Sequence, residues 1–168
     1  LDGRPIKFPP KLFLGAAASP FASRPAFQAL REQKKVNAGA QFFQTNCVFD
    51  LDGFEAWLEA LAQRGVLDKV YILAGIAPLK SARMARHMHE DIPGVRLPKR
   101  ILQRMDEAGD GAEEEGVALA LELIEGVRAL QGVHGIHLMA VGWEEIVPRI
   151  VQDAGLVPSE APAAASRA

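Results

Sequence analysis

Short apolar runs alternate with amphipathic segments along this chain, a pattern that predicts parallel strands connected by helices. Four runs fit strands: residues 12–18, 42–48, 70–76 and 135–141. The first, bounded by Pro10 and Pro20, is expected to be buried on both faces. Parallel β/α units close as a complete barrel of roughly 250 residues or form an open sheet. With 168 residues and about four units, we expect an α/β fold of the (β/α)8 TIM-barrel type, of which about half is present.

The segments between these runs carry helix signals. Ser23 can cap a first helix and Pro25 is tolerated in its first turn, while Phe27 and Leu30 are expected to face inward and the helix to end near Gly39. A second helix is expected to start at a cap at Asp50 or Asp52 and to end at Gly65. A short helix is expected over residues 81–90, and a helical turn over 101–105. The longest helix is expected to follow the acidic residues 106–115, and the last one to cover residues 144–154.

Composition limits the classes of function. The chain is 49% hydrophobic and 24% charged with a net charge of −2, and its cations form no dense block, so neither nucleic acid nor a membrane is expected as a partner. A single cysteine, Cys47, excludes an internal disulfide and fits a reducing cytoplasm. We expect a cytoplasmic piece cut from a longer chain, with a barrel unit over residues 1–157 and a flexible tail over 158–168.

Ligands of parallel β/α folds bind at the carboxyl ends of the strands, so polar residues there are the first site candidates. Asn46 carries an amide that can grip the edge of a heterocycle, or it can simply cap a loop. Lys34 and Lys35, late in the first helix, can reach a phosphate or lie in solvent.

The other reactive residue types favour structural roles. His87 and His89 are two apart on a predicted helix, so they point to different faces, and no metal site is expected. His137 fits a packed or hydrogen-bonded core histidine, and Cys47 fits a small buried apolar residue. The acidic residues 106–115 lack the spacing of a calcium loop.

Several ordered motifs together resemble the methylenetetrahydrofolate reductase family. They are Asn37-Ala-Gly-Ala40, Gln44-Thr-Asn-Cys-Val-Phe-Asp50, Gly75-Ile-Ala-Pro78, Val95-Arg-Leu-Pro98, Gly135-Ile-His-Leu-Met139 and Gly155-Leu-Val-Pro158. The resemblance covers nearly the whole chain before the tail. It implies a TIM-barrel flavoprotein of one-carbon metabolism and methionine biosynthesis, in which reduced FAD converts 5,10-methylenetetrahydrofolate to 5-methyltetrahydrofolate and NAD(P)H or another donor reloads the flavin.

The resemblance also implies a flavin site on the first helix. Lys35 matches a lysine associated with FAD in the family, and a cation there would lie near the pyrophosphate. Four further residues lie at neighbouring flavin-contacting positions: Ser19, Gln28, Arg31 and Lys34.

The implied folate site departs from the family pattern. Asn46 stands where the family has a folate-contacting glutamine, and Met84 where it has a second one. Met88 replaces an aromatic that packs on nicotinamide or folate, and Trp143 replaces an arginine near the substrate. We therefore expect a divergent branch, with a different electron donor or folate form as one outcome.

The resemblance places the family's general acid and its flavin-tuning aspartate in the half of the barrel that is absent here, so no catalytic residue is assigned. A homo-oligomer is expected. Two alternatives stay open: a folate-binding or methyl-transfer accessory protein without NAD(P)H oxidation, and a structural half-barrel subunit that needs a partner chain.

Overall fold

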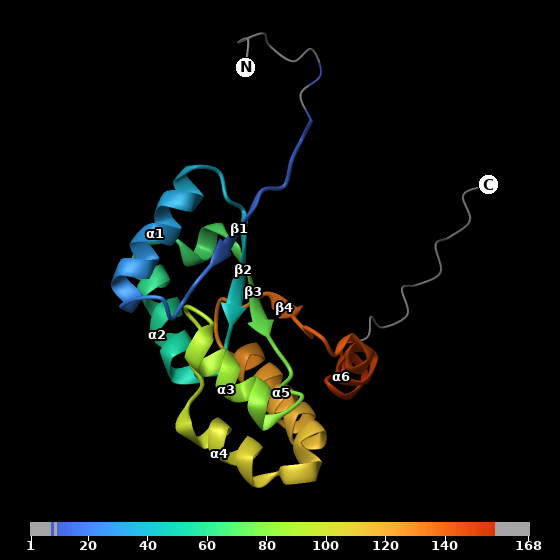
Figure 1. Cartoon of the computed structure of the whole chain (residues 1–168). Coiled ribbons are helices and arrows are strands. Elements are labelled where there is room, and N and C mark those ends of the chain that lie inside the picture. Colours follow the sequence, from blue (N-terminus) through green and yellow to red (C-terminus); the bar gives the residue numbers. More distant parts are fainter. Residues whose placement is uncertain (1–7, 9, 157–168) are drawn as a thin grey trace, which may run out of the picture.

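One sheet of four parallel strands, in the order β1-β2-β3-β4, organises the molecule (Figure 1). The computed structural model describes residues 8 and 10–156. The strands are β1 (Gly15–Ala18), β2 (Phe42–Cys47), β3 (Tyr71–Ile76) and β4 (Gly135–Leu138). Each strand pairs with the next along the chain and a helical segment follows each one, so the fold is a partial TIM barrel. The expected tail over 158–168 lies outside the described residues.

Six α-helices accompany the strands in the described part of the chain. They are α1 (Pro25–Asn37), α2 (Leu51–Ala62), α3 (Ala82–Asp91), α4 (Lys99–Glu107), α5 (Ala112–Ala129) and α6 (Val147–Asp153). Asp50 is the residue that caps α2, accepting from the Gly53 amide, and Ser81 caps α3 by accepting from the Met84 amide. The arrowheads of β2 and β3 point toward the side where α3 and α5 lie (Figure 1), so α3 begins near the carboxyl ends of the strands.

The two faces of the sheet differ in what covers them. On the face packed against helices, Phe43, Ile72 and Ala74 are fully buried. Because side chains alternate along a strand, Phe42 and Tyr71 belong to the opposite face. Tyr71 is 56% exposed there, and Phe13 stacks on Phe42 with ring centroids 5.3 Å apart. We call this second side the open face.

The first strand is shorter and more exposed than expected. Residues 12–14 precede β1 and are largely exposed, and Ala18 is the buried residue of the strand itself. The expectation of burial on both faces is therefore wrong. In the described chain β1 pairs only with β2, which leaves its other edge unpaired.

The first helix also differs from its prediction. Arg24, not Ser23, occupies the cap position, and no side chain caps the helix. Phe27 is 54% exposed, whereas Gln28, Ala29 and Glu32 form the buried side. The inward assignment of Phe27 is wrong because the helix turns a polar stripe, not an apolar one, toward the interior.

The remaining differences are of extent. The expected turn over 101–105 is the longer helix α4, and the acidic run 106–115 contains the end of α4 and the start of α5. β4 stops at Leu138, although the Met139 amide still donates to the Ile76 carbonyl. The last helical segment divides into a 3₁₀ turn over Glu144–Ile146 and α6.

Candidate functional site

An irregularity in β2 marks the carboxyl end of the sheet. Gln44 pairs with Leu73 and Cys47 with Gly75, so β2 has one more residue than β3 over this interval, as in a β-bulge. The Thr45 hydroxyl stabilises the bulge: it accepts from the Gly75 amide at 2.9 Å and donates to the Asn46 carbonyl at 2.9 Å. Bulges re-aim side chains beside functional sites, and this one sets the direction of Asn46.

Glycine is required at position 75 by this arrangement. A Cβ built on Gly75 would lie 2.5 Å from the Thr45 carbonyl oxygen and 2.9 Å from the Asn46 carbonyl oxygen. Both are backbone atoms, which cannot move away without disturbing the bulge. Gly75 therefore allows β2 and β3 to approach closely at the end of the sheet.

Asn46 connects the sheet to the loop that follows α3. Its Oδ1 accepts from the Cys47 amide at 2.8 Å, and its Nδ2 donates to the Pro93 carbonyl at 3.4 Å. The side chain of Asn46 therefore fixes a loop, which is one of the two roles that the sequence allowed. One N–H and one lone pair of the amide remain for a ligand.

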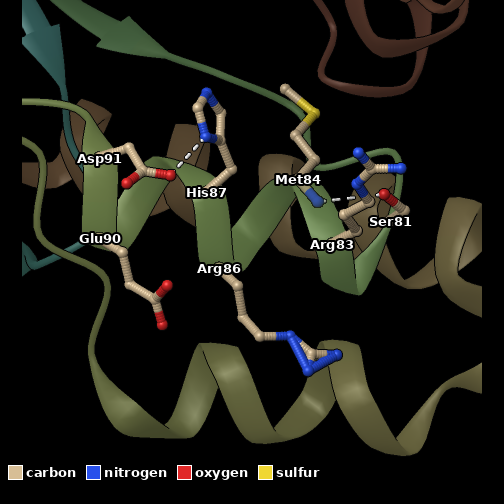
Figure 2. A pocket seen from close by; sticks show the side chains of 7 residues that line it. All are labelled: Ser81, Arg83, Met84, Arg86, His87, Glu90 and Asp91. Atoms are coloured by element: carbon tan, nitrogen blue, oxygen red, sulfur yellow. Dashed lines mark hydrogen bonds and ion pairs between the residues drawn. The ribbon is translucent and has the colours of Figure 1, made fainter.

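Helix α3 carries the two methionines at the implied folate positions. Met84 is half-buried, and Met88 is 9% exposed. A groove of about 800 Å³ lies along α3 and includes Met84, His87 and Asp91 in its lining. Figure 2 shows Met84 and His87 on one side of the helix, with Arg86 and Glu90 directed to the other.

Trp143 is buried, with 4% of its surface exposed. Nζ of Lys80 lies 5.8 Å from the ring centroid, so the lysine covers the indole as a cation–π partner. The same ammonium is 3.5 Å from a carboxylate oxygen of Glu145 and 4.0 Å from one of Glu113. Lys80 would have to move before a ligand ring could stack on this face of Trp143.

Lys35 lies against the interior of the molecule. Its Nζ donates to the Ala17 carbonyl at 2.6 Å and is 2.7 Å from Oε2 of Glu32, which is 1% exposed. The side chain of Lys35 is 34% exposed, so it lies partly in solvent while its ammonium group contacts the protein. A buried carboxylate needs a nearby cation, and Lys35 supplies it.

Two observations bear on whether α1 fits the flavin that the resemblance implies. Gln28 is 1% exposed, and neither polar atom of its amide has a hydrogen-bond partner in the described part of the chain. Native proteins rarely leave buried amides unpaired, so a polar group from outside the described residues is expected here.

The second observation is charge. The final turns of α1 carry three cations, Arg31, Lys34 and Lys35, against the one carboxylate of Glu32. Arg31 and Lys34 are exposed, Ser19 is half-buried after β1, and Lys35 keeps one N–H donor beyond its two contacts. A net charge of +2 beside an unpaired amide fits an anionic, polar cofactor.

Two of the remaining reactive residues, His87 and His89, have hydrogen-bond partners within the described chain. His89 accepts the Leu97 amide at 3.2 Å, whereas His87 pairs with Asp91. Among the described residues no group of three metal-ligating side chains forms. His137 is half-buried, and its buried Nδ1 has no partner within the described chain. Cys47 is buried, as expected, with 6% of its surface exposed, and this burial raises the pKa of its thiol to about 11.

The sequence-based candidates fall into two groups. Ser19, Gln28, Arg31, Lys34 and Lys35 lie on β1–α1, and Asn46, Met84, Met88 and Trp143 lie around the ends of β2, β3 and β4. No hydrogen bond or ion pair within residues 10–156 joins one group to the other.

Sequence reasoning missed three side chains: Glu32, Thr45 and Lys80. The spacing of Glu32, three residues before Lys35, was a usable signal. For Thr45 and Lys80 the sequence carried none.

Comparisons with known proteins point to one family. The family model for methylenetetrahydrofolate reductase matches residues 18–155. "Methylenetetrahydrofolate reductase 1" of Schizosaccharomyces pombe is 28% identical over 130 residues, which are 73% of this chain and 20% of that protein. The chain therefore spans about a fifth of the length of that curated relative.

A solved structure shares the fold. It is an uncharacterized protein from Clostridium thermocellum that binds two copies of 5-methyl-5,6,7,8-tetrahydrofolic acid. The match has a TM-score of 0.63 at 18% identity and covers 87% of this chain and 54% of that one. No described helix is long and apolar enough to cross a membrane.

Proposed function

Because the chain belongs to the methylenetetrahydrofolate reductase family, we propose that it contributes the carboxyl-terminal part of a barrel that reduces 5,10-methylenetetrahydrofolate to 5-methyltetrahydrofolate with FAD. The observation that carries this proposal is the bulge in β2, which directs Asn46 toward the carboxyl end of the sheet beside the loop after α3. Strand carboxyl ends are where parallel β/α enzymes bind substrates.

In this proposal α1 holds the flavin. Bound flavin would supply the hydride that converts the methylene group of the folate to a methyl group. Lys35, Arg31 and Lys34 would provide positive charge for the diphosphate, and the unpaired amide of Gln28 would form hydrogen bonds to polar groups of the cofactor. Ser19, beside the Ala17 carbonyl that Lys35 contacts, would contribute a hydroxyl.

The ends of β2 and the helix α3 would hold the folate. Asn46 has one N–H and one lone pair free for the pterin edge, and a bridging water would make up for its short side chain. Met84 and Met88 would pack on the ring, because thioether side chains adapt to flat ligands. Trp143 would hold Lys80 over its ring, and the ammonium group of Lys80 would pair with a substrate carboxylate. NAD(P)H or another donor, and assembly as a homo-oligomer, belong to the same proposal.

The test is the visible absorption of the full-length gene product. Bands near about 375 and 450 nm that bleach under anaerobic NADH and return with 5,10-methylenetetrahydrofolate would support the proposal, since the cofactor carries the hydride chemistry. A folded full-length protein without flavin would contradict it.

A second candidate is a folate-binding or methyl-transfer accessory protein that does not oxidise NAD(P)H. The ion pair between Lys35 and Glu32 favours it, because a carboxylate 2.7 Å from the lysine lowers the attraction for a diphosphate. Folate binding with flavin bands that NADH leaves unbleached, or with no flavin, would select this candidate.

A further inference from the structure

The groove along α3 is lined by both an apolar side chain, Met84, and a polar one, His87. Met84, His87 and Asp91 recur at helical spacing, so they share a face. In Figure 2, Met84 and His87 project to the side opposite Arg86 and Glu90. Arg86 is occupied on that other side, 2.8 Å from Asp106 of α4. Arg86 and Glu90 also line the groove, but among the described residues Met84 and His87 lie on the side of α3 that faces away from α4.

The histidine in this face is oriented by its neighbour. Nδ1 of His87 lies 2.7 Å from Oδ2 of Asp91, one turn further along the helix. An ionised carboxylate can only accept, so Nδ1 carries the proton and donates. In the neutral ring Nε2 then has a free lone pair, and Figure 2 shows this edge of the ring directed away from the helix.

This pair contributes little to the stability of the fold. Both side chains are about 60% exposed, at 60% for His87 and 62% for Asp91. Exposed side-chain pairs one helical turn apart contribute well under about 1 kcal/mol to folding, so the hydrogen bond between His87 and Asp91 adds little. The exposed imidazole of His87 has a defined orientation and lies on the same side of α3 as the half-buried thioether of Met84. This arrangement suits a flat ligand: the face of its ring would pack on the sulfur atom, and its edge would form a hydrogen bond to the imidazole nitrogen.

We propose that His87, oriented by Asp91, contributes to folate binding by accepting a hydrogen bond from an N–H of the reduced pterin ring while Met84 packs on the ring face. The inference rests on the proposed folate site. It assigns the polar contact on α3 to His87, because the thioether of Met84 has no N–H and accepts only weakly. Reduced pterins carry amino and ring N–H donors, and a neutral imidazole nitrogen is a matching acceptor.

The experiment is an equilibrium titration of the full-length protein with 5-methyltetrahydrofolate. His87→Ala should weaken binding by about 3- to 10-fold, the worth of one net hydrogen bond. Asp91→Ala should weaken it by about 2- to 3-fold, because the ring remains but is no longer oriented. His87→Gln should stay within about 2-fold of the wild type, because its amide oxygen is also an acceptor. Glu107→Gln, which changes an exposed carboxylate of α4 that does not line the groove, is the matched control and should bind like the wild type.

Two results separate this inference from the proposed function. A wild-type protein that binds no folate would overturn the proposed function together with the inference. A wild type that binds, with His87→Ala binding equally well, would overturn the inference alone. Each variant is also unfolded with urea: loss of affinity at an unchanged midpoint supports a ligand contact, and a loss shared by His87→Gln contradicts it.

Discussion

Helices α1 and α2 both connect neighbouring strands, yet the side chains that they bury differ: those of α2 are apolar and those of α1 are mostly polar. α2 buries Phe54, Trp57, Leu58, Ala60 and Leu61. α1 buries Gln28, Ala29 and Glu32 and leaves Phe27 exposed. The apolar side of α2 is sufficient to hold that helix on the sheet. The polar interior of α1 needs partners, and within the described chain Glu32 has one while Gln28 has none.

In the proposed function, α2 serves the core and α1 serves the flavin site. A buried amide without a partner costs about 1–3 kcal/mol, so we expect an ordered water or a ligand to pair with the amide of Gln28. The cations at the end of α1 add a second reason, because they gather charge where the core needs none. We therefore expect substitutions on α2 to change stability and substitutions on α1 to change ligand binding.

The largest expected effect is a difference in stability between two phenylalanine-to-alanine substitutions, one on each helix. Phe54→Ala on α2 removes a fully buried ring stacked on Trp57 and should lower the free energy of unfolding by about 3–5 kcal/mol. Phe27→Ala on α1 removes a ring that is 54% exposed and should cost about 0.5 kcal/mol or less. Urea unfolding of the full-length protein measures both. Equal costs would break the comparison and show that residues outside the described chain cover Phe27.

The Lys35–Glu32 pair should give the next largest effect. Lys35→Ala leaves a buried carboxylate without its cation and should cost about 1–3 kcal/mol, less than a fully buried pair because the lysine is 34% exposed. Flavin occupancy, measured near 450 nm, should fall with it. Glu32→Gln keeps the shape of the side chain and removes its charge, so flavin should bind more tightly. Unchanged occupancy in both variants would remove Lys35 from the site.

Asn46 tests the strand-end site. Asn46→Ala removes the hydrogen bonds to the Cys47 amide and the Pro93 carbonyl and should weaken folate binding by about 10-fold. Asn46→Gln keeps the amide and lengthens the side chain, so folate affinity should change measurably as the amide shifts relative to the pterin. Titration with 5-methyltetrahydrofolate distinguishes them. Asn46→Gln with unchanged affinity and rate would count against a pterin contact at this position.

The smallest expected effect is a loss of folding stability in acid. Hydrogen bonds from Arg104 lower the pKa of Glu122 below the ordinary 4.5, and Arg149 does the same for Glu114. A depressed carboxyl pKa contributes stability above about pH 4.5 that is lost as the pH falls through the lower folded-state value. Both carboxylates are largely exposed, so the loss should be small. Urea midpoints at pH 7 and pH 4 measure it, and a midpoint that rises in acid would contradict this assignment.

Periodicity and capping predicted most of the fold because local signals decide those features. The apolar spacing of Phe54, Trp57, Leu58 and Leu61 placed α2 correctly, and Asp50 and Ser81 cap the helices that follow them. Prediction failed for the run over 12–14. Its apolar composition predicted part of a buried strand, but these residues precede β1 and are largely exposed, with Phe13 stacked on Phe42.

The candidate site was less accessible to sequence reasoning. Asn46 could be chosen from its place at a strand end, but the bulge that turns it depends on a hydroxyl of Thr45 and on the close approach at Gly75. Those are contacts between strands, which no local pattern encodes. The pair of His87 and Asp91 was not predicted: their spacing of four residues allows it, but the hydrogen bond and its orientation over the groove needed the structure.

The most direct test of the account is the flavin content of the full-length Gln28→Leu variant beside that of the wild type. Leucine matches the volume of glutamine and removes the unpaired amide, so the account predicts a lower flavin occupancy with an unfolding free energy that is equal or higher. The same flavin content in both proteins would contradict the claim that the polar interior of α1 serves a cofactor.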